Sequence, residues 1–207
     1  MRTEPMRGLL FVSWGLLAVA AALAFLLGRP VWALDAAVVS LFQGAIYLLR
    51  RTLNLTPLTF GLILSAGLAH CFAVTGLYGR TFWGVEYDSI IHTYTNIVFG
   101  IAAYRYMRKF DVSKAEAAAV GFLFTMGLGV VNEIIEYVGY RIGGEGEGLF
   151  LLGPGDVGAE NAFDNLMTDF LHNAFGGVIG VGLSALSDIL RGRSGKSREA
   201  ADLPESR

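Results

Sequence analysis

The chain has 207 residues, of which 54% are hydrophobic and 16% are charged, and its mean hydropathy is +0.52. Soluble globular domains carry about 25% charged residues. This composition therefore excludes a disordered protein, a nucleic-acid-binding protein and an ordinary soluble enzyme. A single cysteine, Cys71, excludes an intramolecular disulfide framework and a cysteine-rich zinc module. The remaining class is an all-α, polytopic membrane helix bundle.

Six segments are long and apolar enough for membrane-crossing helices, which need about 20 such residues. In chain order they are 8–27, 31–49, 57–78, 87–106, 115–140 and 163–190. Residues 1–27 also fit a cleaved signal peptide, although the length of the apolar run favours a retained span. The predicted transmembrane domain is 1–191, and the polar segment 192–207 is expected to be a disordered cytoplasmic tail.

The basic residues predict the orientation of these six spans. If both termini are cytoplasmic, 13 of the 16 Lys and Arg residues lie in cytoplasmic segments, and the outer segments hold Arg29, Arg80 and Arg141. Basic residues favour the cytoplasmic side. The second span is kept in spite of Asp35, which we expect at the outer membrane interface. The sequence thus predicts a multi-pass protein of the cell (inner) membrane.

Ionisable and amide side chains occur inside the later spans, where they are costly unless they face the bundle interior. Counted along each helix, all three histidines and most of the acids fall in the outer half of the membrane. The ionisable and amide side chains are His70 in the third span, Asp88, His92 and Asn96 in the fourth, Glu133 and Glu136 in the fifth, and Asn165, Asp169, His172 and Asn173 in the sixth. We expect them to meet in one polar cluster.

Imidazole and carboxylate groups together suit a divalent metal such as Zn, Fe or Mn. The predicted metal ligands are Asp88, His92, Glu133, Asp169 and His172. Water bound to such a metal attacks an ester, amide or phosphate. The candidate catalytic residues are Glu136, as general base, together with Glu133 and Asp169.

Other interpretations of single residues stay open. Asp88 also fits the N-cap of its helix, and His70 also fits a hydrogen bond between helices. Arg141, just beyond the fifth span, is expected to pair with Glu136 or Glu133.

Three short motifs follow one another along the chain. They are D-x-x-x-H at Asp88 and His92, E-x-x-E at Glu133 and Glu136 with Arg141 beyond it, and D-x-x-x-N-x-x-G at Asp169, Asn173 and Gly176. This set resembles the VanZ-like superfamily of small integral membrane proteins, in particular its YjdF-like branch. Ser89 replaces the usual VanZ-like lysine, and Glu136, in place of a glutamine, is similar to the YjdF-like pattern. The resemblance covers about residues 85–182 and implies shared membrane-embedded residues rather than a defined activity.

These observations lead to one functional hypothesis and two alternatives. The hypothesis is a metal-dependent hydrolase that acts at the outer leaflet on a lipid or lipid-linked envelope substrate, with membrane lipids as its partners. The first alternative is a proton-coupled transporter or binding protein that uses the same acids as protonation sites. The second is a structural membrane protein whose polar cluster holds the helices together.

Overall fold

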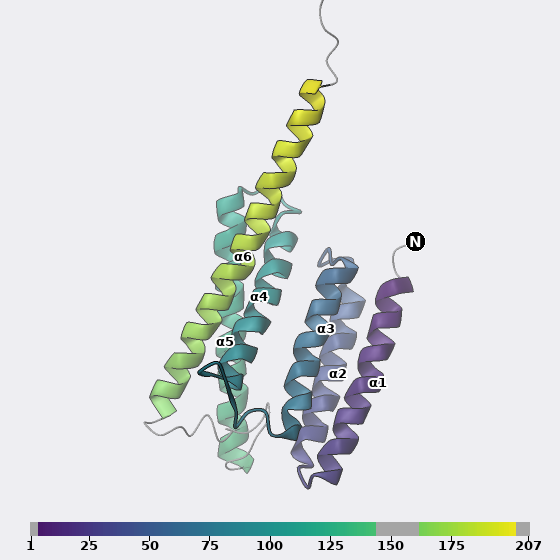
Figure 1. Ribbon diagram of the computed structural model, residues 1–207, viewed down its shortest axis with the longest axis vertical. Coiled ribbons are helices and arrows are strands. Elements are labelled where there is room, and N and C mark those ends of the chain that lie inside the picture. The colour runs from purple at the N-terminus through teal and green to yellow at the C-terminus, as the bar shows by residue number, and fades with distance from the viewer. Residues whose placement is uncertain (1–3, 144–161, 202–207) are drawn as a thin grey trace, which may run out of the picture.

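The computed structural model describes residues 4–143 and 162–201, and side chains within 5–142 and 163–190. These residues form a bundle of six long α-helices (Figure 1). The helices are α1 (Glu4–Leu26), α2 (Val31–Leu49), α3 (Pro57–Phe72), α4 (Tyr87–Met107), α5 (Lys114–Gly143) and α6 (Ala162–Ala201). The prediction of an all-α helix bundle is confirmed.

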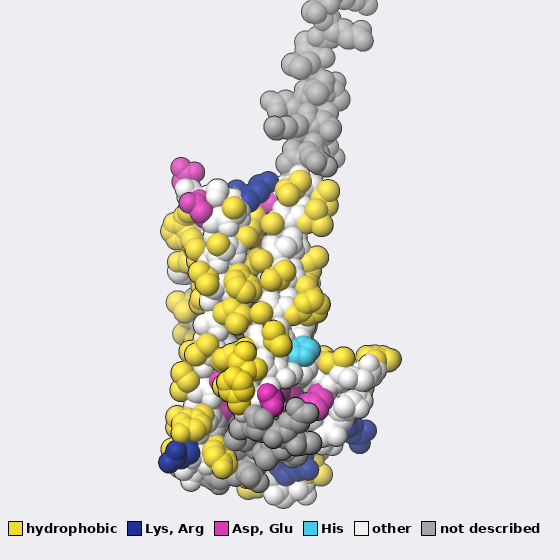
Figure 2. All heavy atoms as spheres, turned by 90° about the vertical axis from the view of Figure 1, so that its left-hand side faces the viewer, with side chains coloured by type: hydrophobic (Ala, Val, Ile, Leu, Met, Phe, Trp, Pro, Cys, Tyr) yellow, Lys and Arg dark blue, Asp and Glu magenta, His cyan; other side chains and the backbone are white. Residues whose placement is uncertain are grey.

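Five of the six helices are long and apolar enough to cross a membrane: α1, α2, α3 with its short extension, α5 and α6. The exception is α4, which is 21 residues long but carries several polar side chains that lower its hydropathy. It runs alongside α5 and α6 and packs against both (Figure 1). Its membrane crossing stays a prediction. Figure 2 shows a broad hydrophobic surface over the bundle, with Lys and Arg side chains near both ends.

Helix boundaries differ from the predicted ones in two places. The third helix ends at Phe72 rather than near residue 78, and a 3₁₀ turn (η1, Ala73–Thr75) follows it. Gly76 then adopts a left-handed φ of 89°, which terminates the helix because glycine enters this region without strain.

The last helix extends beyond the predicted transmembrane domain. α6 continues through residues 192–201, which the sequence leads us to expect as disordered. Residues that favour the helix, such as Ala, Arg, Lys and Glu, make up much of this segment. The segment contains no proline, and the next proline along the chain is Pro204. The remainder of the expected tail, 202–207, lies outside the described residues, as does 144–161 between α5 and α6.

A small β-hairpin that the sequence analysis does not predict connects α3 to α4. Strand β1 (Thr81–Phe82) pairs with strand β2 (Val85–Glu86) in antiparallel register. The two turn residues, Trp83 and Gly84, have φ values of 53° and 81°. Positive φ at both central positions is the geometry of a tight type I′ hairpin turn. We refer to the end of the bundle that carries this hairpin as the hairpin end.

The helices pack in two groups of three. The N-terminal group consists of α1, α2 and α3, the C-terminal group consists of α4, α5 and α6, and α3 with α4 makes the main contact between them. Figure 1 shows the two groups side by side, with α1 beginning and α6 ending at the same end of the bundle, opposite the hairpin end.

Each group is held by close contacts of a different kind. In the N-terminal group, the Ser13 hydroxyl donates to the Gln43 side chain, which itself donates to the Leu64 carbonyl. In the C-terminal group, α6 approaches α4 closely at two glycines. A Cβ atom at Gly176 or Gly180 would lie 2.3 Å from a backbone carbonyl oxygen of α4. Only glycine allows this approach.

Candidate metal centre

Three ionisable side chains of the C-terminal group converge in its interior. His92 of α4 places Nε2 3.6 Å from Asp88 Oδ1, one turn earlier, and 3.9 Å from Asp169 Oδ1 of α6. All three residues are buried, and Asp169 is only 1% exposed. Asp88 does not cap α4, because the N-cap residue is Glu86 and no side-chain cap hydrogen bond is present there.

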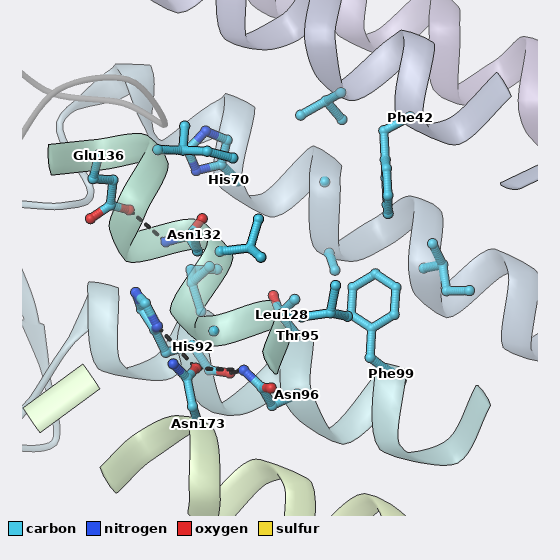
Figure 3. Close-up of a pocket in the computed structure, with 18 of the residues that line it drawn as sticks. Phe42, His70, His92, Thr95, Asn96, Phe99, Leu128, Asn132, Glu136 and Asn173 are labelled. Atoms are coloured by element: carbon cyan, nitrogen blue, oxygen red, sulfur yellow. Dashed lines mark hydrogen bonds between the residues drawn. The ribbon is translucent and has the colours of Figure 1, made fainter. Parts of the chain in front are cut away.

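Neighbouring asparagines fix the orientation of the His92 ring. The Asn96 amide nitrogen donates to the His92 backbone carbonyl and also to Asn173 Oδ1. His92 Nδ1 lies 3.0 Å from that same Asn173 oxygen. Because an amide oxygen only accepts, Nδ1 carries the proton and donates it. The Nε2 atom of the ring therefore faces the two carboxylates (Figure 3 shows the contacts among His92, Asn96 and Asn173).

This arrangement suits a bound cation. Three lone-pair atoms, one each from Asp88, His92 and Asp169, all lie within 4.8 Å of one another. Ligand atoms around one tetrahedral zinc lie about 3.5 Å apart, since each bond is about 2.1 Å. The oxygen that faces away on Asp169, Oδ2, accepts a hydrogen bond from Asn165 at 3.0 Å. Hydrogen bonds of this kind, here from His92 Nδ1 to Asn173 and from Asn165 to Asp169, orient metal ligands in proteins.

The two glutamates of α5 lie beside this group rather than in it. Glu133 Oε1 is 4.0 Å from His92 Nδ1, so it approaches the ring from the side that Asn173 occupies, away from Nε2. Glu136 accepts a hydrogen bond of 2.6 Å from Asn132, one turn before it on the same helix. Of the five predicted metal ligands, three therefore form the compact group and Glu133 flanks it.

Two further predicted site residues lie elsewhere. His172 Nδ1 is 3.0 Å from the Thr93 hydroxyl, and His172 is not part of the three-residue group. Arg141 donates to the Tyr137 hydroxyl of its own helix at 2.9 Å, and its guanidinium lies over that ring. Both of these contacts of Arg141 are within α5.

A second buried polar group, in the N-terminal half, was only partly predicted. His70 Nε2 is 3.6 Å from Asp35 Oδ2, and His70 Nδ1 is 2.7 Å from the Tyr78 hydroxyl. Asp35 is 0% exposed, so its side chain faces the interior of the bundle. Its expected depth at the membrane interface stays a prediction. The signal in the sequence was the matching depth: Asp35 and His70 each lie within a few residues of the hairpin end of their helix.

A cavity of about 300 Å³ separates the two polar groups. Residues from α2, α3, α4, α5 and α6 line it, so it lies between the two halves of the bundle. Figure 3 shows His70, His92 and Glu136 gathered at one end of the cavity and Phe42 and Phe99 at the other. The cavity is thus amphipathic, with the candidate metal group at its polar end.

Comparisons with known proteins identify a family but no characterised relative. No curated protein and no solved structure matches the sequence. Residues 8–188 match a family model described as a predicted membrane protein, DUF2238. This match supports a multi-pass membrane protein, and it does not confirm the VanZ-like and YjdF-like assignment, which stays a resemblance. Because the match covers most of the chain, including all six helices in whole or in part, the protein belongs to the DUF2238 family of membrane proteins.

Proposed function

We propose that this protein is a metal-dependent hydrolase whose metal ligands are Asp88, His92 and Asp169, and whose substrate is a lipid or lipid-linked molecule. The observation that carries the proposal is the direction of His92 Nε2. A cation placed among one imidazole nitrogen and two buried carboxylate oxygens that face one another stabilises all three groups.

The ligand types narrow the choice of metal and of chemistry. One imidazole and two carboxylates suit Zn, Fe or Mn rather than a soft thiolate-binding metal. Three protein ligands leave coordination positions for water and substrate, which is typical of catalytic rather than structural sites. Such a metal lowers the pKa of bound water and polarises an ester or phosphoryl oxygen.

The α5 glutamates are then the candidates for proton transfer. Glu136 lines the cavity, and its hydrogen bond from Asn132 holds the carboxylate in place. In the proposed reaction Glu136 accepts the proton of the attacking water, and Glu133 holds the His92 ring from the opposite side. A general base has to lie within hydrogen-bond reach of the proton that it removes, directly or through one water.

The proposed orientation places the cavity's polar end toward the outer leaflet. Arg29, Arg80 and Arg141 belong to the hairpin end, whereas Arg50 and Arg108 lie in turns at the opposite end. With the larger share of basic residues in the cytoplasm, the hairpin end faces outward in the cell membrane and both termini face inward.

The test is the metal content of the purified protein, measured by elemental mass spectrometry on the wild type, His92→Ala and His172→Ala. We expect one equivalent of Zn, Fe or Mn in the wild type, its loss in His92→Ala, and its retention in His172→Ala. The two variants remove the same kind of side chain, His92 from the cavity lining and His172 from outside it, so His172→Ala controls for a general loss of folding. A metal-free wild type, or equal loss in both variants, would overturn the proposed centre.

Hydrolysis is tested on the metal-loaded protein with phospholipid and lipid-linked substrates in detergent micelles. Product release by the wild type, lost in Asp169→Asn and in Glu136→Gln, supports the proposal. Stoichiometric metal without any such activity would favour a metal-stabilised binding protein or transporter over an enzyme.

A further inference from the structure

A groove of about 400 Å³ runs along the surface between α1 and α2, near the end of the bundle opposite the hairpin end. Its lining on α1 extends from Arg7 to Trp14, which is about 10 Å along the helix. Its lining on α2 extends from Gly44 to Leu48. The groove belongs to the N-terminal group of helices, so it shares no residue with the candidate metal centre.

The walls of the groove are apolar and exposed. On α1, the rings of Phe11 and Trp14 are in edge contact, with centroids 6.0 Å apart, and form one continuous wall. The Trp14 indole nitrogen donates to the Ser40 carbonyl at 3.1 Å, which fixes that ring. On α2 the wall is Leu48, which is 78% exposed. Because α1 and α2 are both able to cross a membrane, hydrocarbon chains of the bilayer cover these walls.

Two hydrogen-bond donors line the same groove. The Arg7 guanidinium lies 5.6 Å from the centre of the Phe11 ring, and no carboxylate among the described residues lies within salt-bridge distance of it. The Tyr47 hydroxyl makes no hydrogen bond to any described residue, although its ring packs against Phe60. Both donors are therefore available to an acceptor that enters the groove.

The charge around the groove is positive. The described side chains of 5–14 and 44–60 include Arg7, Arg50 and Arg51 and contain no Asp or Glu. The Arg50 guanidinium lies 3.9 Å from the centre of the Tyr47 ring, so its charge lies against a side chain that lines the groove. Guanidinium groups bind phosphate through paired hydrogen bonds. A phosphate is thus the acceptor that both the donors and the charge favour.

We infer that this groove binds an anionic phospholipid, with the phosphate at Arg7 and the Tyr47 hydroxyl and one acyl chain along the apolar walls. In the proposed orientation the groove faces the cytoplasmic leaflet, where basic pockets between membrane helices bind acidic lipids. This lipid is a bound partner that joins α1 to α2 rather than a substrate. The inference therefore goes beyond the proposed function and does not depend on the metal centre.

The test is lipid binding measured by native mass spectrometry on the delipidated full-length protein. Phosphatidylglycerol and phosphatidylcholine with identical chains compete at equal concentration. A basic residue near the membrane surface strengthens binding of an anionic lipid about fivefold. With Arg7 in the groove and Arg50 beside it, we expect the wild type to retain phosphatidylglycerol about tenfold over phosphatidylcholine. Equal retention, or a preference for phosphatidylcholine, would overturn the inference.

A matched pair of variants separates the groove from the general positive charge of this end. Arg7→Gln removes the cation that lines the groove, whereas Lys114→Gln removes an exposed cation at the start of α5, at the same end of the other group. We expect Arg7→Gln to lower the preference to about twofold and Lys114→Gln to leave it at about tenfold. Equal losses in both variants would mean a diffuse attraction and would exclude a site in the groove.

Tryptophan fluorescence locates the acyl chain. The chain has three tryptophans, and the double variant Trp32→Phe, Trp83→Phe leaves Trp14 alone. Lipids with brominated chains quench a tryptophan that they contact. We expect half-maximal quenching of Trp14 at about a tenfold lower fraction of brominated phosphatidylglycerol than of brominated phosphatidylcholine. Identical quenching by the two lipids would place the bound lipid elsewhere.

The same spectra distinguish other occupants of the groove. Soluble glycerol phosphate that binds as tightly as the whole lipid would overturn the inference, because the apolar walls would then contribute nothing. A dimer that Gly44→Leu converts to a monomer, while Gly15→Leu does not, would show that a second copy of the chain occupies the groove. A mature chain that lacks α1 would also overturn the inference, because the groove would not exist. A metal-free protein that prefers phosphatidylglycerol would refute only the proposed hydrolase.

Discussion

The glycine contact between α4 and α6 makes a quantitative prediction about both stability and metal binding. In Gly176→Ala, the new Cβ would lie 2.3 Å from the Thr93 carbonyl oxygen, and protein Cβ atoms essentially never come closer than 3.0 Å to such a neighbour. The helices therefore have to separate by about 0.7 Å there. Overpacking of this kind costs about 1–3 kcal/mol, of which the better helix propensity of alanine recovers at most about 1 kcal/mol.

The same separation acts on the candidate metal centre, because Asp169 lies on α6 and its two partners lie on α4. Metal–ligand distances tolerate about 0.2 Å, so a 0.7 Å displacement weakens metal binding as well. The control is Gly182→Ala, whose Cβ meets nothing within 4 Å. Denaturant unfolding in micelles and metal analysis of both variants check the prediction. If Gly176→Ala unfolds at the same denaturant concentration as Gly182→Ala and keeps its metal, the reasoning is wrong.

Three further predictions concern other contacts. If the metal is present at a concentration 100 times its dissociation constant, its removal by a chelator lowers the free energy of unfolding by about 2.7 kcal/mol. Thermal melts with and without chelator check this loss, and the melting temperature of His92→Ala should not change on chelation. Asp35→Ala removes the carboxylate that lies 3.6 Å from His70 Nε2 and lowers the free energy of unfolding by about 1 kcal/mol; an unchanged melting temperature would contradict the importance of this contact. The Arg108–Asp188 ion pair, at 3.3 Å and about one-third exposed, should show a coupling energy below about 1 kcal/mol in a double-mutant cycle, and a larger value would mean that the membrane shields the pair from solvent.

The helical spacing of polar residues accounts for part of the geometry of the candidate site. Asp88 and His92, four residues apart, face the same side of α4, as one helical turn requires. Their meeting with Asp169 was expected from equal depth in the membrane, and the structure places all three within one group. Depth and spacing together are sufficient to find residues that share a helix face and a level in the membrane.

Spacing along the sequence does not show whether His172 or Asn173 faces His92 in the interior of the bundle. The two residues are adjacent, so their side chains point about 100° apart around α6. Asn173 lies on the side that packs against Gly129 of α5, and His172 lies toward Thr93 on the other side. Which side of α6 contacts α5 depends on how three helices pack, which a local pattern does not specify. For the same reason, the pairing of Asp35 with His70 was not predicted.

The polarity of α4 has a consequence for how the protein enters the membrane. Polar and charged side chains raise the cost of inserting an isolated helix, and α4, which carries Asp88, His92 and Asn96, falls short of the hydropathy that the other five described helices reach. Asn96 donates to Asn173 of α6, His92 contacts the same Asn173 oxygen, and Gly100 packs against the backbone of α6. α6 is synthesised after α4. Stable insertion of α4 is therefore expected to require α6. In a chain truncated before α6, α4 would be the first helix to leave the bilayer.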